Sequence, residues 1–101
     1  MDFKVKILFS KLGNLKYISH LDLMRTLTRA LRRSGLVMKF TQGFNPHPIF
    51  SIKEAIKLGL EAKNLEATFM LLDYLKPDFI KETLCNQLPK GLEVTHITVN
   101  A

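Results

Sequence analysis

Alternating apolar and polar residues mark both ends of the chain. Residues 3–7 alternate apolar side chains with lysines and continue into an apolar run up to Phe9, and residues 93–99 also alternate. A period of two is typical of a strand with one face on a core. The apolar runs 36–40 and 67–72 also have strand length. These patterns predict four strands.

Two other segments have the period of an α-helix. The first follows Ser19, a good N-cap with Asp22 three positions later, and stops before Gly35, so a helix is predicted over residues 20–34. The second begins at Pro77 and ends at the run Pro89-Lys90-Gly91. The order strand, helix, strand, strand, helix, strand predicts an α+β domain. We expect a single ferredoxin-like βαββαβ domain over residues 1–101, with two helices packed on one face of an antiparallel sheet.

The run from Gly43 to Pro48, Gly-Phe-Asn-Pro-His-Pro, is predicted to be an ordered loop. Its two prolines lack backbone donors and fix φ, and Gly43 is expected to supply an unusual backbone angle. The period of residues 50–64 fits neither a helix nor a strand clearly.

The predicted first helix has two distinct faces. Leu23, Leu27 and Leu31 fall on one side, and the opposite side carries four arginines: Arg25, Arg29, Arg32 and Arg33. An arginine offers phosphate a planar fork of donors, so this face suits a nucleic-acid backbone. A solvated charged face explains the pattern equally well.

Composition narrows the class of partner. The net charge is +6, and residues 1–50 hold nine Lys or Arg against two Asp, whereas residues 51–101 hold six Lys against seven acidic residues. A fixed basic region favours a polyanionic partner. The chain contains neither an apolar run of roughly 20 residues nor a signal peptide, so we expect a cytoplasmic protein without a membrane partner.

The single cysteine, Cys85, is expected to be a reduced, packed thiol. One thiol cannot hold an iron–sulfur cluster, so the chain is not itself a radical SAM enzyme. No short ligand spacing supports a metal site at His20, Asp22 and His47, and no metal or other cofactor is expected.

Several longer motifs resemble a bacterial family of radical SAM-linked proteins of unknown function. They comprise residues 17–25 (YISHLDLMR), residues 29–36 (RALRRSGL), residues 42–48 (QGFNPHP), Leu58-Gly59 with Glu61, and residues 88–92 (LPKGL). Members of this family are usually longer, so the chain is expected to be an N-terminal portion. The resemblance implies a role around RNA or an RNA-modifying radical SAM enzyme. Residues 52–57 replace a more apolar, proline-containing stretch of the family.

Two histidines are candidates for chemistry. His20 lies in the first turn of the predicted helix and His47 lies between two prolines. If the two converge, they and Tyr17 provide an acid and a base for metal-independent cleavage of RNA. The alternative is that both are structural. The expected pocket at this junction combines the helix start with the loop: Ser19, His20, Asp22, Gly43, Phe44, Asn45 and His47.

Three functions remain open from the sequence. The leading hypothesis is a nonenzymatic RNA-binding or substrate-presenting domain that works with a radical SAM enzyme, in which the four arginines hold the backbone. Contacts from all four to single-stranded RNA predict roughly a 50-fold loss of affinity between about 50 and 200 mM salt. The alternatives are a metal-independent ribonuclease and a protein-docking domain without a nucleic-acid role.

Overall fold

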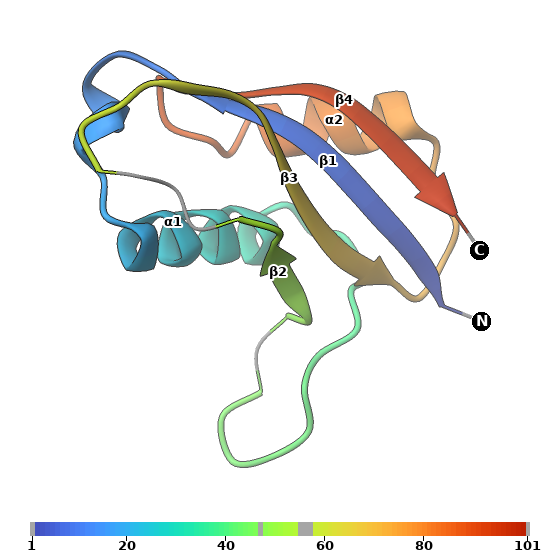
Figure 1. The fold of residues 1–101 in the computed structure, drawn as a ribbon. Helices are drawn as coiled ribbons and strands as arrows, with labels where there is room; N and C mark the ends of the chain where they lie inside the picture. Colours follow the sequence, from blue (N-terminus) through green and yellow to red (C-terminus); the bar gives the residue numbers. More distant parts are fainter. Residues whose placement is uncertain (1, 47, 55–57, 101) are drawn as a thin grey trace.

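Four strands, two α-helices and one 3-10 helix make up the part of the chain that the computed structural model describes, residues 2–46, 48–54 and 58–100 (Figure 1). In chain order they are β1 (Phe3–Lys11), the 3-10 helix η1 (Gly13–Tyr17), α1 (His20–Arg33), β2 (Phe50–Ile52), β3 (Ala62–Leu71), α2 (Pro77–Cys85) and β4 (Leu92–Asn100). Neither α-helix in this part is long and apolar enough to cross a membrane.

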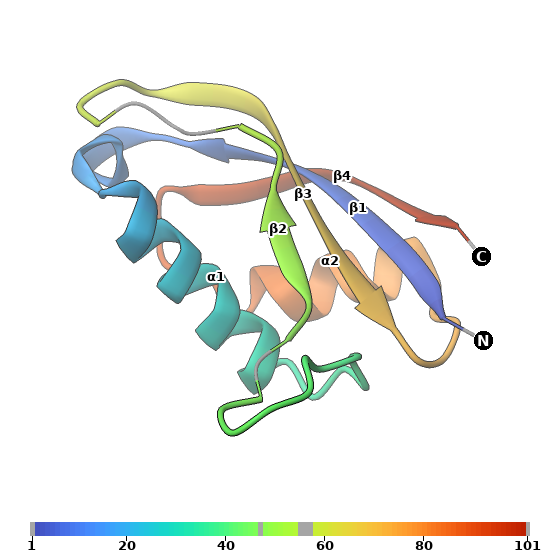
Figure 2. The ribbon, with the colours of Figure 1, turned by 60° about the horizontal axis from the view of Figure 1, so that its bottom comes forward.

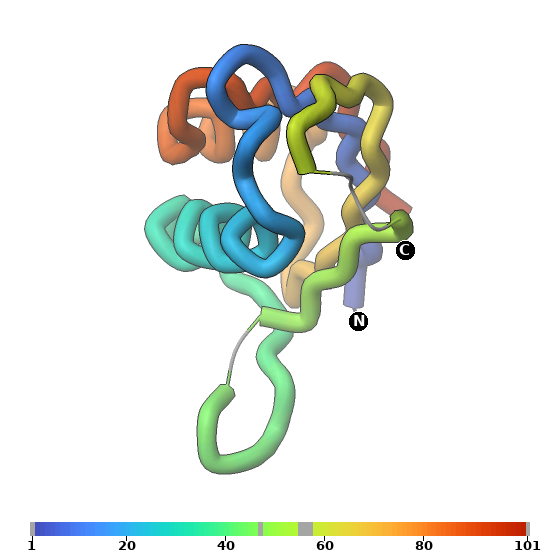
Figure 3. Tube along the Cα trace, turned by 60° about the vertical axis from the view of Figure 1, so that its left-hand side comes forward, coloured from blue at the N-terminus to red at the C-terminus, as the bar shows by residue number. Residues whose placement is uncertain are grey.

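The strands form one open antiparallel sheet in the order β2-β3-β1-β4. Central β1 alternates buried Val5, Ile7 and Phe9 with the less buried Lys4, Lys6 and Leu8, as its sequence predicts. Both helices lie on the same side of the sheet (Figure 3), where their leucines join these residues in one core. The prediction of an α+β fold with two helices and an antiparallel sheet is therefore confirmed.

Helix α1 follows its sequence signals closely. The Ser19 hydroxyl accepts a hydrogen bond from the Asp22 backbone N–H at 3.1 Å, and Gly35 follows the helix with φ of 78°. Its core face consists of Leu23, Leu27, Ala30 and Leu31, all buried. The expected helix and its two faces are thus confirmed, with the C-terminal end one residue earlier.

The predicted strand over residues 36–40 is wrong. Met38 and Phe40 form only isolated bridges, to Leu71 and Pro48 respectively, and the second strand is Phe50–Ile52. Both segments use the outer edge of β3, because Met38 faces Leu71 and residues 50–52 face residues 67–69. The intervening residues leave the sheet as a loop, so neither segment extends into a long strand.

Two further boundaries, the exposure of one side chain and one short helix differ from the sequence interpretation. Strand β3 begins at Ala62, five residues earlier than predicted, and α2 ends at Cys85. Cys85 is exposed instead of packed, because the buried stripe of α2 follows Ile80 and Leu84 and the next residue turns away from it. The short helix η1, over Gly13–Tyr17, is an element that the sequence pattern did not predict.

Candidate nucleic-acid interface

The four arginines of α1 are all exposed along the side opposite its core face. They occupy the second, third and last turns of the helix, which is about 21 Å long at 1.5 Å per residue. The segregation predicted from the sequence therefore places four guanidinium groups on one surface. We call these residues, Arg25, Arg29, Arg32 and Arg33, the arginine face.

Three members of the arginine face have partners within the protein. Arg25 lies 3.7 Å from the Asp22 carboxylate, and both side chains are more than half exposed. Arg33 donates to Gln87, through Nε to the side-chain oxygen at 3.3 Å and through Nη2 to the backbone oxygen at 3.1 Å. A guanidinium has five N–H donors, so these arginines keep donors for a ligand. An exposed ion pair such as Arg25 with Asp22 contributes about 0 to 1 kcal/mol and is easily exchanged.

Arg32 makes a different kind of contact. Its Nη2 donates to the Pro46 backbone oxygen at 3.1 Å, and its guanidinium carbon lies 6.0 Å from the centre of the Phe40 ring. Both contacts tie the helix to the loop that follows it. Arg29, by contrast, has no hydrogen-bond or ion-pair partner among the described residues.

Arg29 separates two shallow surface depressions. One, of about 350 Å³, lies between α1 and the end of α2, and its lining residues are Thr26, Arg29, Arg33, Gln87, Leu88 and Pro89. The other, of about 310 Å³, lies on the loop side of the helix and is lined by Met24, Arg25, Thr28, Arg29 and Arg32. Guanidinium groups thus border hollows on both sides of the helix ridge.

The loop after α1 forms a projecting arm, which we define as residues 40–46 and 48 (Figure 1). The Ile49 N–H donates to the Lys39 oxygen at 2.9 Å, which closes the neck, and Phe40 bridges to Pro48 just beyond it. Gly43 has a φ of 139°, as its place in the loop predicts. Phe44 is completely exposed near the tip. The structure therefore places this aromatic side chain in solvent.

The neck of the arm is also held by charge. Lys39 Nζ lies 2.6 Å from the Asp2 carboxylate, and this hydrogen bond lowers the pKa of the Asp2 carboxyl below its usual range. The Lys39 N–H donates to the Met70 oxygen at 2.9 Å. No local sequence pattern predicts this ion pair, because its two residues lie 37 positions apart.

The expected single pocket is not formed by the described residues. Ser19, His20 and Asp22 lie at the start of α1, whereas the arm is attached through Arg32, about 18 Å farther along the helix at 1.5 Å per residue. Figure 2 shows the arm at the C-terminal end of α1. His47 lies outside the described residues, so the convergence of His20 and His47 stays a prediction. The neighbouring Pro46 is held at the far end of the helix from His20.

His20 has a partly buried side chain, and its Nδ1 is buried without a hydrogen-bond partner in the described structure. The atom faces inward, as its helical position predicts. Tyr17 ends η1 and is exposed, with Lys16 Nζ lying 5.2 Å from the centre of its ring. Among the described residues, no group of three His, Cys, Asp or Glu side chains is arranged to hold a metal ion.

Two of the quoted motifs, Leu58-Gly59 with Glu61 and residues 88–92, contact the region of η1 at the opposite end of the molecule from the arm. The Gly59 N–H donates to the Lys16 oxygen at 2.6 Å, and the Glu61 carboxylate accepts from the Gly13 N–H at 2.7 Å. The Leu12 N–H donates to the Gly91 oxygen at 2.8 Å. These contacts fasten η1 to both neighbouring segments, which gives these motif residues a structural role.

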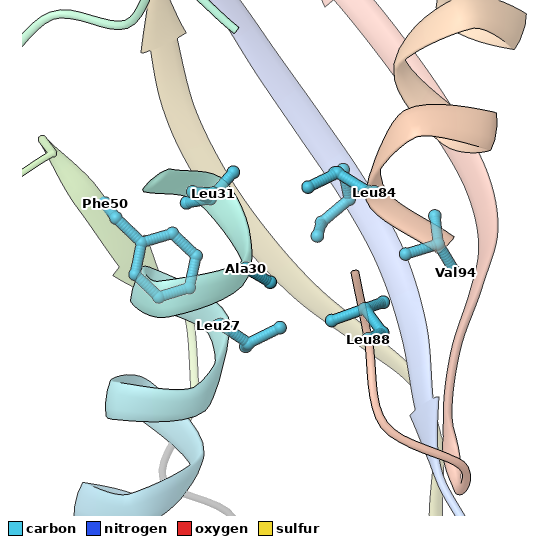
Figure 4. Close-up of a pocket in the computed structure, with 8 residues that line it drawn as sticks. Leu27, Ala30, Leu31, Phe50, Leu84, Leu88 and Val94 are labelled. Atoms are coloured by element: carbon cyan, nitrogen blue, oxygen red, sulfur yellow. The ribbon is translucent and has the colours of Figure 1, made fainter. Parts of the chain in front are cut away.

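The space between the two helices is too small for a ligand. Its lining is apolar, with Leu27, Ala30, Leu31 and Phe50 facing Leu84, Leu88 and Val94 across it (Figure 4). The enclosed volume is about 10 Å³, near the lower limit for one water molecule. Any binding site built on α1 therefore lies on the outer surface of the helix.

Comparison with known proteins gives a family assignment. No curated protein matches the chain. A family model matches residues 4–100, all but the first three residues and the last one. The chain therefore belongs to the family described as an uncharacterized protein conserved in bacteria (DUF2344).

Proposed function

We propose that this domain binds RNA without cleaving it and presents it to a partner enzyme, with the arginine face of α1 as the main contact surface. The observation that carries the proposal is Arg29, an exposed guanidinium without a described protein partner that stands between two depressions. Arg25 and Arg33 stand beside it with donors to spare. Several guanidinium groups on one surface provide positive charge and donor forks for the phosphates of a nucleic-acid backbone.

The charge distribution supports the same proposal. The net charge of +6 comes from the first half of the chain, which contains both α1 and the arm. The acidic groups near the arginine face are few: Asp22 pairs loosely with Arg25 across 3.7 Å. A concentrated positive region attracts a polyanion and raises its rate of association.

The partner enzyme is the part of the proposal that rests on sequence resemblance. The motifs of the chain resemble radical SAM-linked proteins, and the single cysteine requires that any radical SAM chemistry be supplied by another polypeptide or module.

The strand order β2-β3-β1-β4, with two helices on one side, supports a ferredoxin-like arrangement as the finer description of the fold.

A charge-reversal experiment tests the RNA proposal. The variant Arg25→Glu/Arg29→Glu reverses the charge of Arg29, which lines both depressions, and of Arg25, which lines one of them. We expect its affinity for structured and single-stranded RNA to fall by at least roughly tenfold at low salt. The control Lys63→Glu/Lys81→Glu makes the same change in net charge at exposed residues elsewhere. Gel-shift titrations measure both, and denaturing gels report whether the bound RNA stays intact.

The control decides whether position or total charge matters. Equal losses in both variants would mean that only net charge attracts RNA, and the arginine face would have no special role. Cleavage of the bound RNA would contradict a carrier function and favour a nuclease. Absence of binding by the parent protein at low salt would remove RNA and favour a protein-docking domain.

A further inference from the structure

The arm interrupts the pairing of the chain with the outer edge of β3, and the two ends of the arm lie close together. Met38 faces Leu71 on β3, and Phe50 faces Phe69 two residues along, so the chain leaves and rejoins the same edge. The neck contacts between Lys39 and Ile49 hold the ends together. Such a compact loop with close ends is an Ω-like loop, a kind of segment that frequently carries function.

The tip of this arm exposes an aromatic ring that contributes nothing to the core. Phe44 is completely exposed, and Phe40 at the base of the arm is 41% exposed. Burying a Phe side chain contributes about 1.5 to 3 kcal/mol, so a ring left in solvent gives up this stabilisation. A base of an unpaired nucleic acid has a flat face on which such a ring can stack.

Arg32 positions the arm relative to the arginine face. It bonds to the Pro46 oxygen at 3.1 Å, two residues from Phe44, and its guanidinium lies 6.0 Å from the Phe40 ring centre. The same arginine lines the depression shared with Arg25 and Arg29. The side chain of Arg32 thus connects the arm to the arginine face.

We infer that the arm is a base-stacking element, that the RNA bound by this domain is unpaired, and that Arg32 is a positioning residue for Phe44 instead of a phosphate contact. This inference rests on the proposed RNA binding. The positive charge on α1 alone would attract duplex RNA as well as unpaired RNA, because both carry phosphates. The exposed ring of Phe44 favours unpaired RNA, since the faces of the bases in a duplex are covered by their neighbours in the stack.

Replacing the ring provides a direct optical test. The chain contains no tryptophan, so Phe44→Trp places a single indole at the tip of the arm. We expect an oligouridylate of about 12 nucleotides, within the range of single-strand site sizes, to bind this variant like the parent and to quench its fluorescence. We expect Phe44→Ala to lose roughly tenfold in affinity for this oligonucleotide, and to bind a duplex of equal length as the parent does.

Arg32 is tested by coupling to Phe44. Arg32→Met keeps most of the aliphatic stem and removes the guanidinium, and we expect it to weaken single-strand binding several-fold. In the Phe44→Ala background the same change should have little further effect, because the ring that Arg32 positions is gone. The slope of affinity against salt should stay unchanged in Arg32→Met and fall by about 0.7 in Arg29→Ala.

The possible results separate the two proposals. If the parent binds the oligonucleotide but Phe44→Ala binds it equally well and Phe44→Trp shows no quenching, the stacking arm is overturned while RNA binding stands. Additive losses from Arg32→Met and Phe44→Ala, with a reduced salt slope, would make Arg32 a phosphate contact and overturn its positioning role. If the parent binds no RNA at low salt, both proposals fail.

Discussion

Lys11 is a lysine whose surroundings differ from those of the other lysines on β1. It follows the odd-numbered core positions of that strand, and its side chain is fully buried, with Nζ lying 3.4 Å from the Lys16 oxygen. Burial lowers the pKa of the Lys11 ammonium below its ordinary 10.5. The sequence pattern predicted this strand only as far as Phe9, but the strand continues to Lys11, and Ser10 and Lys11 are both buried.

This burial predicts a specific pH dependence of stability. Between the lowered pKa and 10.5, folded Lys11 has lost its proton while the unfolded chain still binds one, so the free energy of unfolding rises with pH in this window. Lys11→Met should lack this rise. Urea denaturation of both proteins between about pH 7 and 10.5 measures the difference. Parallel pH profiles would show that burial of the ammonium has no effect on stability.

At the scale of elements, Gly91 allows the turn before β4 to pack against η1. Its φ is 103°, and a Cβ added there would lie 2.7 Å from the Leu12 oxygen and 3.0 Å from the Leu15 side chain. The same residue accepts the Leu12 N–H through its carbonyl. The glycine thus meets both a backbone requirement and a close approach between two segments.

Gly91→Ala should therefore be strongly destabilising. Backbone strain and the clash with a backbone oxygen together predict a loss of about 3 kcal/mol in the free energy of unfolding. Gly35→Ala is the matched control, because Gly35 has a φ of 78° and no described atom within 4 Å of the added Cβ. It should cost about 1 kcal/mol from backbone strain alone. Equal losses in denaturant unfolding would contradict a role for close packing at Gly91.

Local signals predicted α1 well. Ser19 and Gly35 gave its ends, and the spacing of leucines and arginines gave its two faces, because all these signals act within a few residues. The edge of the sheet was harder to predict. Whether Met38 or Phe50 pairs with β3 depends on which segment reaches a strand that follows both of them in sequence. The apolar run of residues 36–40 carries no information about that competition.

In the candidate site, too, local features were predicted from the sequence and contacts between distant residues were not. The four arginines were predicted on one surface because helical geometry fixes their directions. The attachment of the arm to Arg32 was not predicted, since it depends on the path of a loop over the C-terminal end of α1. The contact of Arg33 with Gln87 was missed for a similar reason, because 54 residues separate the two.

At the scale of the whole molecule, the residues that stabilise the described structure lie apart from the exposed residues proposed to bind RNA. The core lies between one face of the sheet and the two helices, and three hydrogen bonds hold the region of η1 at one end of the molecule. The arginine face and the arm project from the outer side and the other end of α1. Substitutions on that surface should therefore change binding while leaving the fold intact.

The most direct test of RNA binding is the salt dependence of affinity for single-stranded RNA. With Arg32 assigned to the arm, three arginines remain for phosphate contacts, and a slope near −0.7 per contact predicts roughly a 20-fold loss of affinity between about 50 and 200 mM salt. Binding titrations with oligouridylate across this range measure the slope. A slope near −2 would agree with the arginine face as the RNA-binding surface. Binding that does not change with salt, or no binding at the lowest salt, would contradict it.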